Sequence, residues 1–143
     1  MKSSKEALSL KGVVVKNMSF KLGQTLTITV IPNSEATHFV INLGNSDDYL
    51  ALHMSFRFDA HGDTRTVVCN SYHGGMWFEE HKEAQFPFNQ GEKFKTNITF
   101  TKEQFLVALP DGLVIHFPNR QRDEKYKCID FEGEVRIQSI EII

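Results

Sequence analysis

The chain has 143 residues, enough for one domain with its own hydrophobic core. Sixteen Lys and Arg residues against eighteen Asp and Glu residues give a formal net charge of −2, and no basic run appears, so no nucleic-acid partner is expected. No apolar run approaches the roughly 20 residues of a membrane span, so no membrane insertion is expected. The two cysteines, Cys69 and Cys128, are too few for a disulfide scaffold and are expected to stay reduced.

The N-terminus differs in character from the rest of the chain. Residues 1–9 are polar and lack the apolar segment of a secretory signal. We therefore expect a flexible N-terminal arm over residues 1–9, a single domain over residues 10–143 and a cytoplasmic site of synthesis.

The composition of the domain favours strands. Twelve Phe residues and many Thr, Val and Ile residues alternate with turn residues at short intervals. No segment keeps the 3.6-residue apolar period of an amphipathic helix, although the charged residues 121–127 are compatible with a short helical turn. In chain order, strands are expected over residues 12–16, 24–31, 39–43, 49–58, 64–70, 77–83, 94–100, 105–109, 113–117 and 133–143.

The segment 24–31 alternates cleanly. Leu26, Ile28 and Val30 share one face and three Thr residues share the other, which predicts a half-buried strand of an antiparallel sheet. Turn signals recur about every eight to twelve residues along the chain, among them the hairpin turn Pro-Asp-Gly at residues 110–112. This pattern predicts an all-β sandwich of two sheets.

The segment 49–58 carries a row of polar side chains. His53, Ser55 and Arg57 face one way together, because side chains of a strand alternate with a period of two. The following strand could place Asn70 beside this row. The apolar residues expected on the opposite, core-facing side are Leu50, Leu52, Met54 and Phe56.

The only Trp of the chain, Trp77, lies close to this polar row in sequence. A pyranose ring offers hydroxyls to hydrogen-bonding side chains and one apolar C–H face to an aromatic ring. The combination indicates a carbohydrate site, although a lone Trp in an all-β domain is more often a core residue. His61 and Asp63 could form a metal pair, but two ligands in one turn make no metal site, and a turn is favoured.

Two apolar segments, residues 13–15 and 140–143, could lie side by side near one edge of the sandwich. An exposed apolar edge invites pairing with a second copy, so a homodimer is expected. The alternative is that Ile140, Ile142 and Ile143 complete the core.

Three spaced motifs follow one another in the middle of the chain. They are His53-x-Ser-x-Arg57, Val-Cys-Asn-Ser at residues 68–71, and Trp77-x-x-Glu80-x-Lys82, with supporting matches at residues 86–88, 109–112 and 116–120. Their order and spacing resemble the galectins, the β-galactoside-binding lectins, and specifically the one-domain prototype type. The resemblance extends from about residue 16 to the C-terminus.

This resemblance implies a jelly-roll sandwich of two antiparallel sheets that binds galactosides on one concave face, with no cofactor and no metal. It implies that His53 and Arg57 bond the axial 4-hydroxyl of galactose, and that Asn70 and Glu80 take the 6-hydroxyl. Trp77 would stack on the apolar face of the ring, which removes C–H surface from water.

The resemblance also implies contacts to the second sugar of lactose or N-acetyllactosamine. Glu80 and Lys82 would reach its 3-hydroxyl, and His61 and Asp63 match a family loop that orients the arginines. The expected partners are β-galactoside glycans on glycoproteins or glycolipids, cross-linked by a non-covalent homodimer. The family further implies non-classical secretion to the extracellular space.

Three residues depart from the family pattern. Ser55 stands where galectins usually carry Asn, Phe56 where they carry Pro, and Lys82 where they carry Arg. Losing one amide contact at Ser55 would weaken binding by about 0.5–1.5 kcal/mol, and Lys82 lacks the bidentate fork of Arg. We expect weakened or shifted galactoside binding; the alternative is a degraded sugar site in a structural or protein-interaction domain.

An enzyme is the remaining functional class. A glycosidase needs two carboxylates that flank the scissile bond. Only Glu80 is expected to face the site, so no catalytic residues are assigned.

Overall fold

A computed structural model of the protein describes residues 11–143, so the arm expected over residues 1–9 lies outside the described residues. This part of the chain is built from strands, and no helix in it could span a membrane. The strands are β1 (Lys11–Val15), β2 (Phe20–Lys21), β3 (Thr25–Pro32), β4 (His38–Ser46), β5 (Tyr49–Ala60), β6 (Asp63–His73), β7 (Met76–Trp77), β8 (His81–Glu83), β9 (Phe94–Phe100), β10 (Gln104–Ala108), β11 (Val114–Pro118), β12 (Lys125–Tyr126), β13 (Cys128–Gly133) and β14 (Val135–Ile142).

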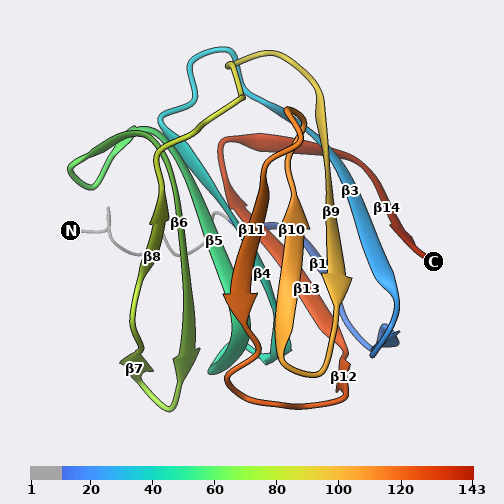
Figure 1. Ribbon diagram of the computed structural model, residues 1–143. Coiled ribbons are helices and arrows are strands. Elements are labelled where there is room, and N and C mark those ends of the chain that lie inside the picture. The colour runs from blue at the N-terminus through green and yellow to red at the C-terminus, as the bar shows by residue number, and fades with distance from the viewer. Residues whose placement is uncertain (1–10) are drawn as a thin grey trace.

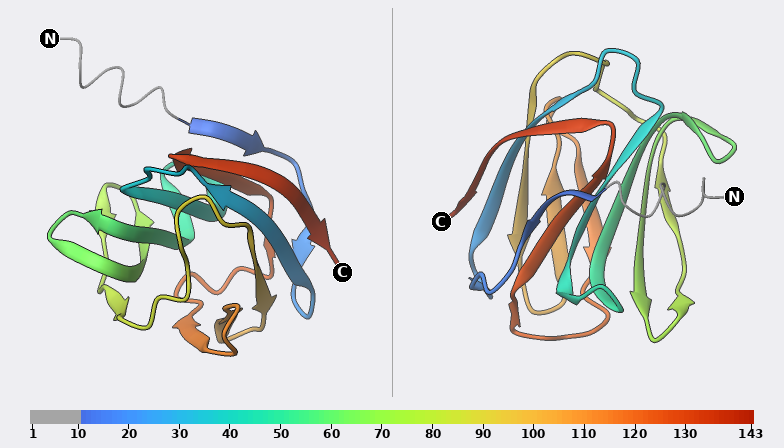
Figure 2. Two further views of the ribbon diagram at one scale, coloured as in Figure 1. Left: turned by 90° about the horizontal axis from the view of Figure 1, so that it is seen from above. Right: turned by 180° about the vertical axis from the view of Figure 1, so that it is seen from behind.

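Two large sheets pack face to face, as Figure 1 and Figure 2 show. The seven-stranded sheet has the order β1-β13-β4-β5-β6-β7, with β8 also paired to β6, and the five-stranded sheet has the order β11-β10-β9-β3-β14. All of these pairs are antiparallel, and β2 pairs with β12 in a small separate sheet. The predicted all-β sandwich of two antiparallel sheets is confirmed.

The core between the sheets is dense in aromatic rings. The ring centroids of Phe39 and Phe56 lie 4.7 Å apart in a stacked pair, and those of Phe88 and Phe94 lie 4.2 Å apart. Every Phe except Phe78 is buried. Burying a side chain of this size contributes about 1.5–3 kcal/mol, so these rings supply much of the driving force for folding.

The cleanly alternating strand is confirmed as β3, with one difference on its outer face. Leu26, Ile28 and Val30 are fully buried, as predicted. Thr27 and Thr29 are also nearly buried, because β3 has a partner strand on each side and neighbouring side chains cover the Thr row.

The prediction that Leu50 belongs to the core row of β5 is wrong. Pairing with β6 matches Leu50 to Tyr72 and then His53 to Asn70, so β5 holds one extra residue in a β-bulge. The bulge reverses the alternation, so Ala51 joins Leu52 in the core cluster, whereas Leu50, although only 8% exposed, lies outside that cluster. Downstream of the bulge, the predicted alternation holds as far as Phe58.

One further expectation fails near the C-terminus, and one strand there was not expected. Residues 121–127 form a turn and the strand β12 rather than a helical turn. Tyr126 is fully buried, and its hydroxyl donates to Oδ1 of Asn119 at 2.6 Å, which holds this segment against the core. Strand β13 was not predicted, although Ile129 and Phe131 alternate with polar residues as a half-buried strand requires.

Strands β1 and β14 form the edges of different sheets and do not pair with each other. Figure 2 shows both edges on the same side of the sandwich. Val14 is 46% exposed and Ile143 is 79% exposed, whereas Ile140 and Ile142 pack partly against the core. The C-terminal strand therefore serves the core and also leaves apolar surface at the edge.

Strand pairing brings distant polar residues into line across the seven-stranded sheet. One row runs Asp130, Asn42, His53 and Asn70 over the strands β13, β4, β5 and β6. Directly opposite residues of antiparallel strands have side chains on the same face, so this row lies on the outer face of the sheet. The fold thus places the predicted polar residues on one surface.

Candidate functional site

A cleft of about 420 Å³ opens on the outer face of the seven-stranded sheet. It lies over β5, β6 and the short strand β7. Its lining residues are His53, Arg57, Val68, Asn70, Trp77, Phe78 and Glu80. Five of the nine predicted site residues line this cleft, and the other four are Ser55, His61, Asp63 and Lys82.

Arg57 is held in place by two of those four. Its Nε donates to Oγ of Ser55 at 3.1 Å, and its Nη1 donates to Oδ2 of Asp63 at 2.7 Å. Ser55 is only 2% exposed, so its hydroxyl supports Arg57 from beneath and does not line the cleft. The guanidinium keeps further N–H donors, which remain for a ligand in the cleft.

Asp63 is shared between two cations. The Nζ of Lys82 lies 3.1 Å from both carboxylate oxygens of Asp63, and Arg57 bonds one of them. Hydrogen bonds from Lys82 and Arg57 hold the pKa of Asp63 below its usual range. The carboxylate therefore stays charged and keeps Arg57 oriented at mildly acidic pH.

His61 lies in the turn between β5 and β6, away from the cleft lining. It adopts a positive φ of 52°, and its ring meets that of His38 edge-on at 5.1 Å. Its place next to Asp63 makes it part of the loop that orients Arg57.

His53 is fixed by Asn42 of the neighbouring strand β4. The Nδ2 of Asn42 donates to Asp130 at 2.9 Å and to Glu132 at 2.8 Å, so its Oδ1 faces Nδ1 of His53 at 2.7 Å. A neutral His53 then donates from Nδ1, and its Nε2 is a hydrogen-bond acceptor. Burial, helped by the charge of Arg57, lowers the pKa of His53 to about 4, which keeps the ring neutral near pH 7.

Trp77 presents a ring at the cleft rather than in the core. It is 51% exposed, and its ring centroid lies 4.6 Å from that of His53 and 4.7 Å from that of Tyr72. The core interpretation of the lone Trp is therefore wrong. Contacts on two sides hold the indole in one orientation, with surface left for a ligand.

Asn70 is held by three hydrogen bonds of its amide group. Its Oδ1 accepts from the backbone N–H of Ser71 at 2.8 Å and from Nη1 of Arg120 at 3.2 Å. Its Nδ2 donates to the carbonyl of Phe78 at 3.1 Å, which leaves one N–H of the amide. Asn70 therefore offers a donor to the cleft, and the exposed Glu80 offers an acceptor.

Comparison with known proteins agrees with this geometry. Residues 11–142 match the family described as galactoside-binding lectin. The chain is 54% identical over 134 residues to a beta-galactoside-binding lectin of Electrophorus electricus, covering 94% of this chain and 99% of that protein. The chain belongs to the galectin family.

Solved galectin structures share the fold. The crystal structure of Dario rerio galectin-1-L2 has a TM-score of 0.90 and 61% identity, covering 91% of this chain and 98% of that one. Congerin II with bound lactose and MES has a TM-score of 0.88 and 38% identity, with coverage of 92% and 98%. CG-16, a homodimeric agglutinin from chicken liver, has a TM-score of 0.87 and 36% identity, with coverage of 92% and 98%.

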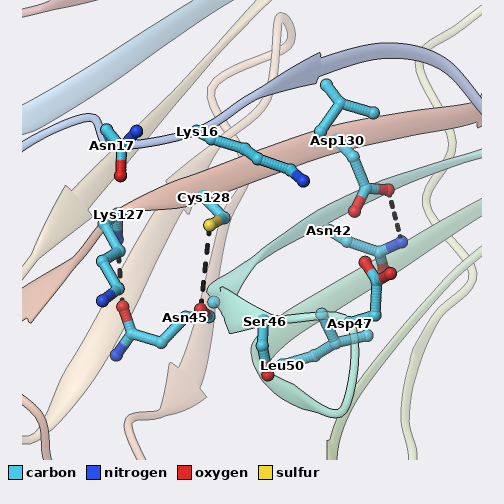
Figure 3. Close-up of a pocket in the computed structure, with 12 residues that line it drawn as sticks. Lys16, Asn17, Asn42, Asn45, Ser46, Asp47, Leu50, Lys127, Cys128 and Asp130 are labelled. Atoms are coloured by element: carbon cyan, nitrogen blue, oxygen red, sulfur yellow. Dashed lines mark hydrogen bonds between the residues drawn. The ribbon is translucent and has the colours of Figure 1, made fainter.

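A second hollow, of about 320 Å³, lies on the same face of the sheet, and Figure 3 shows the residues that line it. Asn42 lines the hollow and bonds His53 of the cleft, so the two are neighbours. Leu50, turned outward by the bulge, forms part of the hollow wall with Lys16 and Asp130. The free thiol of Cys128 also lines it.

Sequence reasoning missed several residues that line or support the cleft. Val68 could have been found from the period of two, because it shares a face with Asn70 on β6. Asn42 and Asp130 could not, since their position depends on which strands pair. Phe78 carried a weak signal as the one residue between Trp77 and the two glutamates that follow.

Proposed function

We propose that this galectin binds β-galactosides in the cleft over β5 and β6. The observation that carries the proposal is the arrangement of three polar side chains: His53, Arg57 and Asn70 are each fixed by a neighbour and line one cleft with the half-exposed Trp77. Preorganised groups bind without first paying the entropy of being ordered, so such an arrangement favours a small rigid ligand. The lactose-bound state of congerin II supports the same ligand class.

The proposed roles follow from the donor and acceptor directions. Nε2 of His53 accepts from the axial 4-hydroxyl of galactose, and Arg57 donates to the same oxygen. Asn70 donates to the 6-hydroxyl and Glu80 accepts from it. An equatorial 4-hydroxyl leaves Nε2 of His53 and the remaining N–H donors of Arg57 without a ligand partner, which explains how such a site would reject glucose.

The second sugar is expected to bind less firmly. The side chain of Lys82 is 49% exposed, and its ammonium forms an ion pair with Asp63. It therefore offers the second sugar a looser contact than a bidentate Arg would. Ser55 is too short and too buried to reach a ligand directly. We therefore propose galactoside binding that is weaker than a full set of family contacts would allow. His61 acts only through its loop.

No enzymatic activity is proposed for this chain. Glu80 is the one carboxylate among the residues that line the cleft, and glycoside hydrolysis needs two. The alternative of a degraded site is not favoured, because five of the family positions still line one cleft.

We further propose a homodimer joined at the edges formed by β1 and β14, which leave Val13, Val14 and Ile143 exposed. Two sites in one dimer would cross-link multivalent glycans and add avidity without tighter single sites. The homodimeric agglutinin CG-16 supports this arrangement. Family membership supports synthesis in the cytoplasm and non-classical secretion to the extracellular space.

Calorimetric titration with lactose, N-acetyllactosamine and cellobiose tests the proposed function. We expect heat from the first two sugars and none from cellobiose, whose non-reducing sugar has an equatorial 4-hydroxyl. The fluorescence of Trp77, the only Trp, provides a second signal of binding at the cleft. Absence of both signals with millimolar lactose would defeat the proposal.

A further inference from the structure

Arg120 connects the second sheet of the sandwich to the cleft. It follows β11, the edge strand of the five-stranded sheet, by two residues, and it belongs to the matching segment 116–120, none of whose residues lines the cleft. Its side chain reaches across to the seven-stranded sheet, where it contacts β6 and the segment after β7.

Three hydrogen bonds define the position of this guanidinium. Nη1 donates to Oδ1 of Asn70 at 3.2 Å and to Oγ of Ser71 at 2.9 Å. Nη2 donates to the backbone carbonyl of Glu79 at 2.8 Å. The guanidinium carbon lies over the ring of Phe117, 4.8 Å from its centroid, and this cation–π contact adds to the three hydrogen bonds.

The contact with Asn70 decides which end of its amide faces the cleft. With Oδ1 occupied by Arg120 and by the N–H of Ser71, only an N–H of Nδ2 remains for a ligand. The contact with Glu79 anchors the carbonyl immediately before Glu80. Arg120 therefore holds both groups proposed to recognise the 6-hydroxyl of galactose.

We propose that Arg120 is the positioning residue for recognition of the galactose 6-hydroxyl, acting through Asn70 and through the backbone next to Glu80. This inference rests on the proposed galactoside-binding function. The planar fork of Arg serves three acceptors in different directions at once, whereas the ammonium of Lys is a single point with freely turning donors. The proposal therefore predicts that Lys at position 120 cannot replace Arg120 in this role.

The test compares lactose with a lactose analogue that lacks the 6-hydroxyl on its galactose. In the wild-type protein we expect the analogue to bind about three- to tenfold more weakly, the effect of losing one or two hydrogen bonds. Arg120→Lys and Arg120→Met should bind the analogue as the wild-type protein does. Both should lose most of their preference for lactose, so that the two affinities lie within about twofold.

Arg65→Lys is a matched control. Arg65 also donates to a backbone carbonyl, that of Phe86 at 2.8 Å, and its guanidinium also lies over a Phe ring, at 5.2 Å, but it does not line the cleft. Its replacement should leave the preference for lactose unchanged. A merely structural role of Arg120 would weaken both ligands equally and keep their ratio.

Ser71→Ala provides a second variant should the Arg120 variants fold poorly. It removes one of the three acceptors of Arg120 and leaves the Asn70 amide unchanged. The ratio of the affinities for lactose and for the analogue should therefore fall, but less than in the Arg120 variants. An unchanged ratio in Ser71→Ala and in every folded Arg120 variant would overturn the inference. Failure of the wild-type protein to bind lactose would instead overturn the proposed function on which it rests.

Discussion

The Nδ1 of His53 lies 2.7 Å from the Oδ1 of Asn42, and this contact fixes the hydrogen-bonding direction of the ring that faces the cleft. Asn42 has no freedom to turn its amide, because Asp130 and Glu132 both accept from its nitrogen. The acceptor at Nε2 of His53 is thus set by carboxylates on β13, two strands away.

Replacing Asn42 by Ala should weaken lactose binding by about 1 kcal/mol, roughly fivefold, because His53 loses the group that fixes its tautomer. Nitrogen-15 NMR of the imidazole should show the proton on Nδ1 in the wild-type protein and a mixture in the variant. Asn97→Ala is the control, since Asn97 accepts from Thr27 on the other sheet at 2.8 Å. Equal losses in both variants would rule out this role.

Lactose affinity should stay constant as the pH falls from 7.5 to 5.5. The pKa of His53 is lowered to about 4, so the acceptor at Nε2 persists through the range in which an ordinary His gains a proton. Affinity should fall only as the pH approaches 4, because the imidazolium has no acceptor. Fluorescence titration at half-unit intervals measures this profile, and a midpoint near 6.5 would contradict it.

Trp77→Leu should weaken lactose binding by about 2 kcal/mol, roughly thirtyfold, because the stacking surface is lost. Thermal unfolding should change little, since the indole is 51% exposed and lies outside the core. Calorimetry gives the affinity and scanning calorimetry the stability. A large drop in melting temperature would mean that Trp77 is chiefly a structural residue.

Lys82→Arg should tighten binding of lactose several-fold while leaving methyl β-galactoside unchanged. An Arg could hold Asp63 with one edge of its planar fork and still aim a fixed donor at the second sugar, whereas Lys82, bonded to both oxygens of Asp63, has only one freely turning N–H left for it. Competition titrations with the two ligands separate these effects, and equal changes for both would refute the assignment to the second sugar.

Ser55→Asn should likewise tighten binding, but through the galactose ring itself. The longer amide can keep the contact with Nε of Arg57 and extend toward the cleft, for a gain of about 0.5–1.5 kcal/mol. Calorimetry with methyl β-galactoside measures this gain. A loss of affinity together with a lower melting temperature would show that the position, 2% exposed in the native protein, has no room for the larger side chain.

Much of the fold was predictable because its strands alternate. In the segments around Leu26 and Phe100, apolar and polar residues alternate with a period of two, which shows which side chains face the core. The same holds for the row from His53 to Arg57. The bulge at Ala51 was not predictable, since an extra residue is visible only against a partner strand. The same reason hid Asn42 and Arg120, whose roles depend on contacts between segments far apart in the sequence.

The bulge in β5 also determines how substitutions and deletions along this strand should act. Upstream of it the even-numbered Leu50 faces outward, and downstream the odd-numbered His53 and Arg57 do. In a library of single substitutions along β5, sorted for retained sugar binding, tolerance to substitution should therefore alternate between neighbouring positions. The phase of this alternation should reverse between Leu50 and His53. Deleting one residue there would bring both halves of the strand into one phase, and one half would then have its core and its solvent faces exchanged.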